Sequence, residues 1–333
     1  MTERKKINVR FTNGLSFESG VRDILNVVLA EYEFVESDQA EFFIFGPYGS
    51  DIPKGPATRI GYYCENIKPD LSICDWAFGM RYEEEVNDPR YRRLQWHGVE
   101  PNSLVKSGFN VHEVIETKTR FCNFVYSNRV PFREKFFAEL SKYKRVDAPG
   151  ISMNNMAGID SGNGNSGDRW QRKRAFISRY KFTIAFENSS YPGYHTEKLL
   201  DPMIAGSLPI YWGNPSIDRH FNPHSFVNAH EQLKANGSRV VEFLDANCQR
   251  EFAASSDRKD ALSARVARRL KHVGQAVKTR LQYEANFDRL IERIIEIDRD
   301  DSLYARYLAE PWFHRNTPPA NDAVVQRWRE IFG

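Results

Sequence analysis

Apolar runs that are typical of strands alternate with helical patterns along the first part of the chain. Ile7, Val9 and Phe11 alternate with polar residues, which predicts a strand that ends at Asn13-Gly14. Further apolar runs predict strands at residues 41–46, 59–63 and 71–78. Strands that alternate with helices indicate an α/β domain with a largely parallel sheet. Ligands of such sheets bind beyond the carboxyl ends of the strands, so polar residues at these ends are site candidates.

The most informative stretch comprises residues 180–228. An apolar run at residues 182–186 predicts a buried strand, and a polar turn follows at residues 187–190. A helical pattern begins after Thr196, and a second apolar strand covers residues 208–212. The residues that this unit gathers around the N-terminus of the helix are Tyr194, His195, Glu197 and Lys198. Free backbone N–H groups and a positive dipole make such a helix end suitable for a phosphate.

Two charged residues outside this stretch also stand where a ligand is expected. Glu65 follows the apolar run at residues 60–64, so it is either a solvated loop carboxylate or a functional group at a strand end. Arg133 lies in the first turn of a predicted helix, where the helix dipole does not favour a cation. A local disagreement of this kind is expected where a residue serves a ligand, and the alternative is an ordinary arginine on the helix surface.

Residues 81–114 are dense in charged and aromatic side chains. They predict either a partly exposed loop region or a surface that binds a carbohydrate, because sugar hydroxyls and ring faces favour polar and aromatic partners. The residues that carry the second hypothesis include Tyr82, Tyr91, Trp96 and His97.

Composition sets broad limits on the class of protein. With 333 residues, the chain is long enough for about two domains. Its 47 basic and 44 acidic residues leave a formal net charge of +3, which excludes a strongly basic nucleic-acid binder. No run approaches the ~20 apolar residues that cross a bilayer, and residues 1–6 lead into a strand rather than forming a secretory signal. Four cysteines without metal-like spacing predict a reduced, cytoplasmic protein.

An amphipathic helix is predicted after residue 260. Its apolar positions are Leu262, Val266, Leu270, Val273, Val277 and Leu281. The opposite face is basic and carries Arg265, Arg268, Arg269, Lys271, Lys278 and Arg280. Such a pattern is typical of a solvated face above a stripe packed on the core. The alternative is contact with an anionic membrane surface.

The motifs of residues 180–228 resemble those of a known family. They read FENS, then Y-x-TEK-L, then P-I-Y-W-G-x-P and finally F-x-x-x-S-F-V-N, and they resemble the bacterial α-1,3/4-fucosyltransferases, inverting enzymes that use GDP-fucose. The resemblance implies an α/β fold of the GT-B type, with two Rossmann-like domains that face each other across a cleft. Together with a glycine- and asparagine-rich loop at residues 147–168, it predicts an N-terminal acceptor and catalytic-base domain at residues 1–146. It also predicts a GDP-sugar-binding domain at residues 147–310. A tail at residues 311–333 is expected to pack back on the first domain.

The resemblance also assigns roles to individual residues. Glu65 corresponds to the catalytic base that takes the proton of the acceptor hydroxyl. Donor binding is expected from Arg133, Asn155, Glu187, Asn188, Tyr194, Glu197 and Lys198. Lys198 and Arg133 are expected to neutralise the diphosphate in place of the metal ion that many transferases use, so no metal and no other cofactor is expected. Glu197 is expected to accept hydrogen bonds from sugar hydroxyls or to stabilise positive charge on the sugar.

The expected function is transfer of L-fucose from GDP-β-L-fucose to a glycan hydroxyl, in α-1,3 or α-1,4 linkage, during synthesis of lipopolysaccharide or another surface glycan. The expected location is the bacterial cytoplasm or the periphery of the inner membrane, with no nucleic-acid partner. Two alternatives stay open. His195 stands where bacterial members carry an aliphatic residue, so another GDP-deoxysugar is the donor if this side chain faces the sugar. The second alternative is a nucleotide-sugar-binding protein without turnover, and the joint presence of Glu65, Arg133 and Lys198 argues against it.

Overall fold

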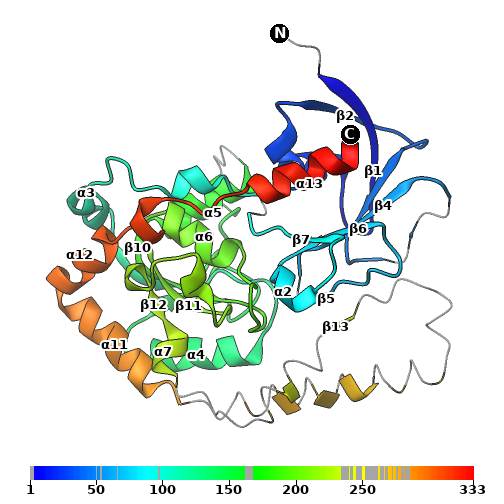
Figure 1. The fold of residues 1–333 in the computed structure, drawn as a ribbon. Coiled ribbons are helices and arrows are strands. Elements are labelled where there is room, and N and C mark those ends of the chain that lie inside the picture. The colour runs from blue at the N-terminus through cyan, green and yellow to red at the C-terminus, as the bar shows by residue number, and fades with distance from the viewer. Residues whose placement is uncertain are drawn as a thin grey trace.

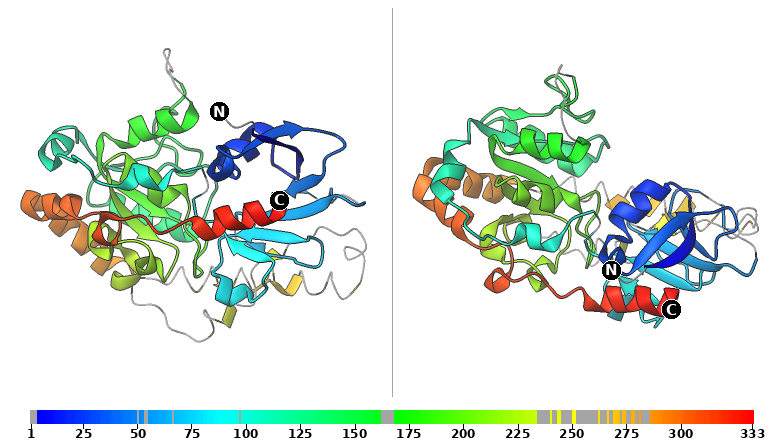
Figure 2. Two further views of the ribbon diagram at one scale, coloured as in Figure 1. Left: turned by 45° about the horizontal axis from the view of Figure 1, so that its top comes forward. Right: turned by 90° about the horizontal axis from the view of Figure 1, so that it is seen from above.

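Two α/β domains, each with its own parallel sheet, make up the molecule (Figures 1 and 2). The computed structural model describes residues 4–49, 51–52, 55–65, 67–96, 98–161, 168–233 and 286–333, with residues 240, 243–244, 250–251 and scattered positions from 262 to 281. Two parallel sheets with helices packed on them are the arrangement of a GT-B fold, so the predicted fold class is confirmed.

The first domain is built on a six-stranded parallel sheet. In order across the sheet, its strands are β2 (Tyr32–Glu36), β1 (Lys5–Thr12), β3 (Phe42–Phe45), β4 (Thr58–Tyr63), β6 (Trp76–Gly79) and β7 (Tyr91–Arg93). The short helices α1 (Phe17–Asp23) and α2 (Glu83–Val86) belong to the same domain. The strands form their own core with Ile7, Val9, Ile44 and Ile60 fully buried, as the apolar positions of the sequence predict.

The second domain carries a five-stranded parallel sheet. Its strands, in order, are β12 (Val227–Asn228), β11 (Leu208–Trp212), β10 (Tyr180–Phe186), β8 (Arg120–Asn123) and β9 (Val146–Asp147). Its helices are α3 (Val111–Glu116), α4 (Pro131–Ser141), α5 (Arg169–Ile177), α6 (Glu197–Ile204), α7 (Ala229–Gln232), α11 (Asp288–Arg299) and α12 (Asp301–Ala309). A separate two-stranded pairing joins β5 (Ile67–Lys68) to β13 (Arg250–Glu251). Single 3₁₀ turns occur at Asn26–Val28, Pro101–Leu104, Ile217–Arg219, Pro223–Ser225 and His314–Asn316.

The predicted boundary between the domains at residues 146 and 147 is wrong. Strand β8 pairs with β10, and β9 pairs with β8, so residues 120–147 belong to the second sheet. The glycine- and asparagine-rich loop after Asp147 is a connection from a strand to a helix within the second domain, not a linker. The chain passes between the domains after β7 instead, which places Arg133 in the same domain as residues 187–198.

The C-terminal helix α13 (Asp322–Phe332) returns to the first domain and lies along its sheet (Figures 1 and 2). Trp328 stacks on Phe78 of β6 with ring centroids 4.2 Å apart. Phe332 makes an edge contact with Phe42 of β3 at 4.9 Å. Both aromatic residues of the helix are buried, so its eleven residues supply part of the first domain's core.

Replacing Trp328 with alanine is expected to lower the free energy of unfolding by about 3–5 kcal/mol, because a buried indole leaves a large cavity. Denaturant titration followed by far-UV circular dichroism measures the change. Trp170→Ala is the matched control, since the Trp170 side chain is 38% exposed on α5 and its removal opens no such cavity. Equal losses in the two variants would contradict the packing of α13 described above.

The amphipathic stretch after residue 260 is not packed as the more ordinary interpretation predicts. Five of its six apolar side chains are exposed, with Leu262 at 80% and Leu270 at 65%, and the sixth, Leu281, is half-buried. The interpretation as a stripe packed on the core is therefore wrong at these positions, and membrane contact stays a prediction. Three of its basic residues, Arg265, Arg268 and Arg280, lie outside the described residues. None of the helices described here is long and apolar enough to span a bilayer.

Candidate active site

The carboxyl ends of the two sheets meet at the loop that follows β10. Glu65 stands just beyond the end of β4, and the loop from Glu187 to Thr196 approaches it from the second domain. The hydroxyl of Tyr191 in this loop donates to the backbone carbonyl of Glu65 over 3.2 Å. A predicted catalytic carboxylate and a predicted phosphate-binding helix end therefore lie together where ligands of parallel sheets bind.

A compact network of charges forms at the N-terminus of α6. The buried carboxylate of Glu187 accepts from the backbone N–H of Thr196 at 2.7 Å and from its hydroxyl at 2.9 and 3.0 Å. The ammonium of Lys198 lies 3.3 Å from Glu187 and 3.4 Å from Glu197. Thr196 caps the helix by accepting from the N–H of Lys198. The sequence motif thus folds into one unit in which a buried acid fixes the helix cap.

The pKa values of this network follow from burial and from the neighbouring charges. Burial raises the pKa of Glu187, although Lys198 works against this shift. Burial alone would raise the pKa of Glu197 as well, but Lys198 and Lys173 lower it to about 2. Burial alone would lower the pKa of Lys198, yet Glu187 and Glu197 raise it above its ordinary value. Lys198 is consequently a permanent cation beside the helix end, ready to attract an anionic ligand.

Arg133 lies beneath the loop after β10 rather than on the helix surface. Its guanidinium is fully buried and lies 3.5 Å from the ring of Tyr126. It donates to the carbonyl of Phe186 and to the side-chain oxygen of Asn188, each at 3.1 Å, and to the carbonyl of Asn128 at 2.7 Å. Burial lowers the pKa of this arginine. Arg133 thus holds the polar turn in place and adds positive charge under it.

Tyr194 is buried in the same loop and stacks on Tyr191, with ring centroids 4.7 Å apart. Its hydroxyl finds no hydrogen-bond partner in the part of the chain that the structure describes. Burial raises the pKa of this phenol, and the charges of Glu187 and Glu65 add to the effect. A buried hydroxyl without a partner calls for an explanation, and a ligand oxygen would supply the missing acceptor.

The side chain of Asn155 is occupied by its own loop. Its oxygen accepts from the backbone N–H of Ala148 at 2.8 Å, and its nitrogen donates to the carbonyl of Val146 at 2.8 Å. These bonds shape the turn at the end of β9. The structure therefore shows a loop-stabilising role for Asn155 and does not join its side chain to the network at Lys198.

His195 does not face the space between Glu65 and Lys198. It is fully buried against Trp96 and Phe221, at centroid distances of 6.1 and 5.2 Å. Arg93 approaches its Nδ1 atom at 3.5 Å, and since arginine only donates, this nitrogen is the acceptor. The condition under which His195 would indicate another donor sugar is therefore not met. Its polar imidazole is held by contacts between the domains.

Three aromatic residues proposed for an acceptor surface are buried instead. Tyr82, Tyr91 and Trp96 are each at most 3% exposed. The hydroxyl of Tyr82 donates to the carbonyl of Ser216 at 3.2 Å, so this side chain joins the two domains. The hypothesis of an acceptor surface at these residues is wrong, because their rings form part of the core and of the domain interface. His97 lies outside the described residues.

Sequence reasoning missed several residues beside the site. Tyr48, on the loop after β3, is 60% exposed, and partial burial of its phenol, followed by the nearby charge of Glu65, raises its pKa. Tyr191 and Arg93 connect the loop after β10 to the first domain. The position of Tyr48 just beyond a strand end was a usable signal. Nothing in the sequence alone marks Arg93, since it is one of three arginines within four residues.

His220 provides a titratable group at the domain interface. Burial lowers its pKa to about 3, and nearby cations add to this effect. The groups that face it are Arg93, Arg219, His314, Tyr82, His195 and, with the opposite effect, Glu84. Because the folded-state pKa lies below the ordinary 6.5, the unfolded chain binds the proton first as the pH falls. The stabilisation from neutral His220 is complete above pH 6.5 and is lost between pH 6.5 and about 3.

The free energy of unfolding is therefore expected to fall as the pH is lowered from 6.5 to 5, by at most about 1.4 kcal/mol per pH unit for one proton. His220→Gln removes this contribution and should make the dependence less steep, while His195 and His230, whose pKa values burial also lowers, keep part of it. Denaturant titrations at four or five pH values measure both slopes, and His112→Gln is a control in an exposed helix. A slope in His220→Gln equal to that of the wild type would contradict the assignment.

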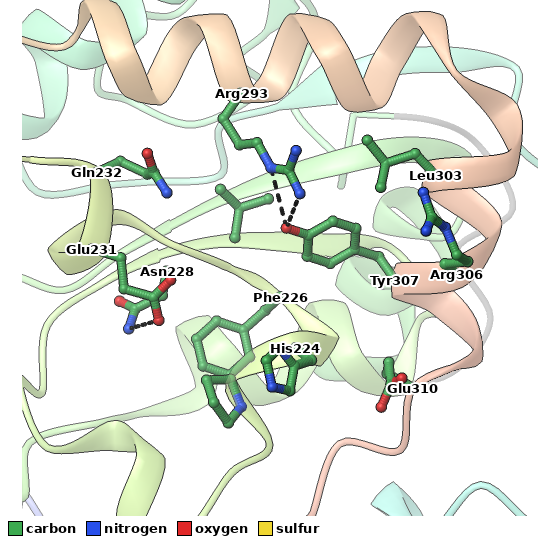
Figure 3. Close-up of a pocket in the computed structure, with 12 residues that line it drawn as sticks. His224, Phe226, Asn228, Glu231, Gln232, Arg293, Leu303, Arg306, Tyr307 and Glu310 are labelled. Carbon is green, nitrogen blue, oxygen red and sulfur yellow. Dashed lines mark hydrogen bonds between the residues drawn. The ribbon is translucent and has the colours of Figure 1, made fainter.

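A separate pocket of about 240 Å³ opens in the second domain between α7, α11 and α12 (Figure 3). Phe226, Arg293 and Tyr307 are among its lining residues, and Arg293 donates to the Tyr307 hydroxyl at 3.1 and 3.3 Å. The residues that line it include none of the predicted site residues.

Among the described residues, no group of three or more His, Cys, Asp and Glu side chains is arranged to hold a metal ion.

Comparison with known proteins agrees with this division of the chain. Residues 9–98 match a family model described as the alpha-(1,3)-fucosyltransferase FucT N-terminal domain. Residues 115–250 match the model of glycosyltransferase family 10 (fucosyltransferase), C-terminal part. The gap between the two matches, at residues 99–114, lies where the chain passes from the first sheet to the second, between β7 and β8.

Curated relatives include an alpha-(1,3)-fucosyltransferase, FucT, of Helicobacter pylori, which is 32% identical over 209 residues. That match covers 53% of this chain and 41% of the relative. A protein of Acanthamoeba polyphaga mimivirus, named provisionally as a fucosyltransferase, is 42% identical over 195 residues, which cover 57% of this chain and 30% of the relative. The matched part of the chain thus spans less than half the length of either relative.

Among solved structures, an alpha1,3-fucosyltransferase with GDP superimposes with a TM-score of 0.65 at 21% identity, over 99% of this chain and 91% of that one. The same kind of enzyme with GDP-fucose gives 0.65 at 20% identity, over 100% and 92%. These likenesses show the fold. With two adjacent family models matched in the order of the two domains, the chain belongs to glycosyltransferase family 10, the fucosyltransferases.

Proposed function

We propose that this protein transfers L-fucose from GDP-β-L-fucose to a hydroxyl of a glycan acceptor, with inversion, in α-1,3 or α-1,4 linkage. One observation carries the proposal: Glu65 and the helix end at Lys198 lie on opposite domains and are joined through Tyr191. The names of relatives support it. The Helicobacter pylori protein is named as an alpha-(1,3)-fucosyltransferase, and a solved structure of the same fold contains GDP-fucose.

The chemistry follows from the charges. The diphosphate of the donor lies against the N–H groups and positive dipole of α6, with Lys198 as a charge-assisted donor. As the bond between the anomeric carbon and the phosphate oxygen breaks, Lys198 stabilises the negative charge that develops on GDP. The acceptor oxygen attacks from the opposite face, and its proton passes to Glu65. A single in-line displacement converts the β-linked donor into an α-fucoside.

The remaining donor contacts are assigned by their place around this centre. The Tyr194 hydroxyl, which has no hydrogen-bond partner among the described residues, donates to an oxygen of the GDP-sugar. Glu197 accepts from a hydroxyl of the sugar or ribose or stabilises positive charge on the sugar. Arg133, Glu187 and Asn188 act mainly through the loop that they hold together. The reaction proceeds without a metal ion, since Lys198 supplies the fixed positive charge beside the diphosphate.

The acceptor that we propose is lipopolysaccharide or another surface glycan of a bacterium. The enzyme works in the cytoplasm, at the periphery of the inner membrane. The exposed apolar positions Leu262, Val266 and Leu270 support this placement, because they would bury their side chains at a lipid surface.

Incubation with radiolabelled GDP-fucose and N-acetyllactosamine tests the transfer, with product identified by its linkage. A parallel set of GDP-sugars tests the donor, and EDTA in the assay is expected to leave the rate unchanged. Product from another GDP-deoxysugar but not from GDP-fucose would favour the alternative donor. Tight GDP-fucose binding with no product across an acceptor panel would instead support a non-catalytic binding protein.

A further inference from the structure

The loop from Ser189 to His195 belongs to the second domain but is seated on the first. Gly193 has a φ of +86°, and a Cβ atom there would lie 2.4 Å from the carbonyl oxygen of Met80. Only glycine fits this approach, because other residues would both clash and strain the backbone. Tyr191 makes the second attachment through its bond to the Glu65 carbonyl.

Arg93, at the end of β7, makes the third attachment. Its guanidinium donates to the carbonyl of Gly193 at 3.1 Å and to that of Met80 at 3.0 Å. It also contacts the Nε2 atom of His220 at 3.1 Å and lies 4.7 Å from the centre of the Tyr82 ring. A further bond connects it to the side chain of Gln95. The guanidinium of Arg93 therefore binds hydrogen-bond acceptors from both domains in a fixed fork geometry.

The arrangement is unusual for a buried cation. Arg93 is 7% exposed, and within the described part of the chain no carboxylate lies within ion-pair distance of its guanidinium. Glu83 accepts from the backbone N–H of Arg93 at 3.0 Å instead. Burying a charge without a charged partner is unfavourable, so stability alone does not explain this residue. Its contacts instead serve the geometry of the loop beside the site.

We propose that Arg93 is a positioning residue that sets the distance between the base and the bound donor. It acts by seating the carbonyl of Gly193, three residues before the helix cap at Thr196, on the first domain. Arg93 touches neither Glu65 nor Lys198, but it fixes the loop that leads from one to the other. The kinetic part of this inference rests on the proposed function.

These contacts predict that replacing Arg93 changes kcat rather than the affinity for GDP. The groups assigned to GDP all belong to the second domain, so GDP affinity should persist when Arg93 is replaced. The alignment of base, acceptor and donor depends on both domains, and a displacement of about 1 Å costs ~10²-fold in rate. Arg93→Met is therefore expected to lower kcat about 10²-fold with little change in the dissociation constant of GDP. Arg93→Lys should recover part of the loss, because one ammonium still reaches the Gly193 carbonyl but cannot span the full set of acceptors.

Three measurements on the full chain test the proposal: kcat and KM for transfer, GDP affinity by calorimetry, and hydrogen–deuterium exchange of the segment 189–196. Arg92→Met is the matched control. Arg92 is the neighbour of Arg93 on β7, lies on the alternate face, and is paired only distantly with Glu83, at 4.0 Å. Arg93→Met should show loss of exchange protection in this segment with GDP affinity retained, whereas Arg92→Met should resemble the wild type.

Wild-type protection and wild-type kcat in Arg93→Met would overturn the proposal. Loss of GDP affinity in step with kcat would also overturn it, since that result indicates a general structural role. If the wild-type protein fails to transfer fucose, the proposed function fails, but exchange protection with and without GDP still decides whether Arg93 seats the loop.

Discussion

Replacing Glu65 with glutamine is expected to reduce turnover about 10²- to 10⁴-fold while GDP binds as tightly as before. Glutamine keeps the size and hydrogen-bonding shape of the side chain but cannot take a proton from the acceptor. The Tyr191 hydroxyl bonds to the backbone carbonyl of residue 65, so this contact survives the substitution. Steady-state transfer assays and calorimetry with GDP measure the two effects separately.

Glu36→Gln is the matched control for this variant. Glu36 ends β2 of the same sheet and is exposed, so the exchange removes a carboxylate at a strand end without touching the site. Its turnover should equal that of the wild type. If Glu65→Gln kept near wild-type turnover, the assignment of the base would be wrong. If both GDP affinity and turnover collapsed, Glu65 would have to be reassigned to donor binding.

Lys198→Ala should remove most of the donor binding and also destabilise the second domain. The variant loses the cation at the helix end, an effect of about 10²–10³ in rate for one lost electrostatic contact to developing charge. It also leaves the buried carboxylate of Glu187 without its ion-pair partner at 3.3 Å, which costs about 3–5 kcal/mol. Steady-state transfer assays measure the loss of rate, calorimetry with GDP measures the loss of donor binding, and denaturant titration measures the loss of stability.

Lys181→Ala separates the two effects of the Lys198 change. Lys181 is also a partly buried lysine of the second domain, and it pairs with Asp298 at 3.2 Å, away from the helix end. Its loss should lower stability without weakening GDP binding. Wild-type GDP affinity in a folded Lys198→Ala variant would show that the diphosphate lies elsewhere.

The sheets and the unit at residues 180–228 are predictable because their patterns are local. Strands buried on both faces read as continuous apolar runs, and Thr196 is an effective helix cap. The domain boundary is not predictable in this way. A long glycine-rich loop has the same composition whether it joins two domains or a strand to a helix in one domain. Only the pairing of β8 with β10 distinguishes the two cases.

The candidate site shows the same division between local and long-range information. The FENS and TEK motifs predict Glu187 and Lys198 as donor-binding residues, and the structure joins them with Thr196 in one network that spans only twelve residues. His195 and Arg93 are 102 residues apart, and their contact arises from the way two domains meet. No local pattern carries that contact, so the sequence left the orientation of His195 open.

Helix α13 makes the first domain discontinuous in sequence. Its sheet is complete by residue 93, but part of its core arrives only with residues 322–332. On a ribosome, the second domain is fully synthesised before the first can bury Phe78 beneath Trp328. The domain that carries the base therefore reaches its final packing last, after the donor-binding half has had time to form.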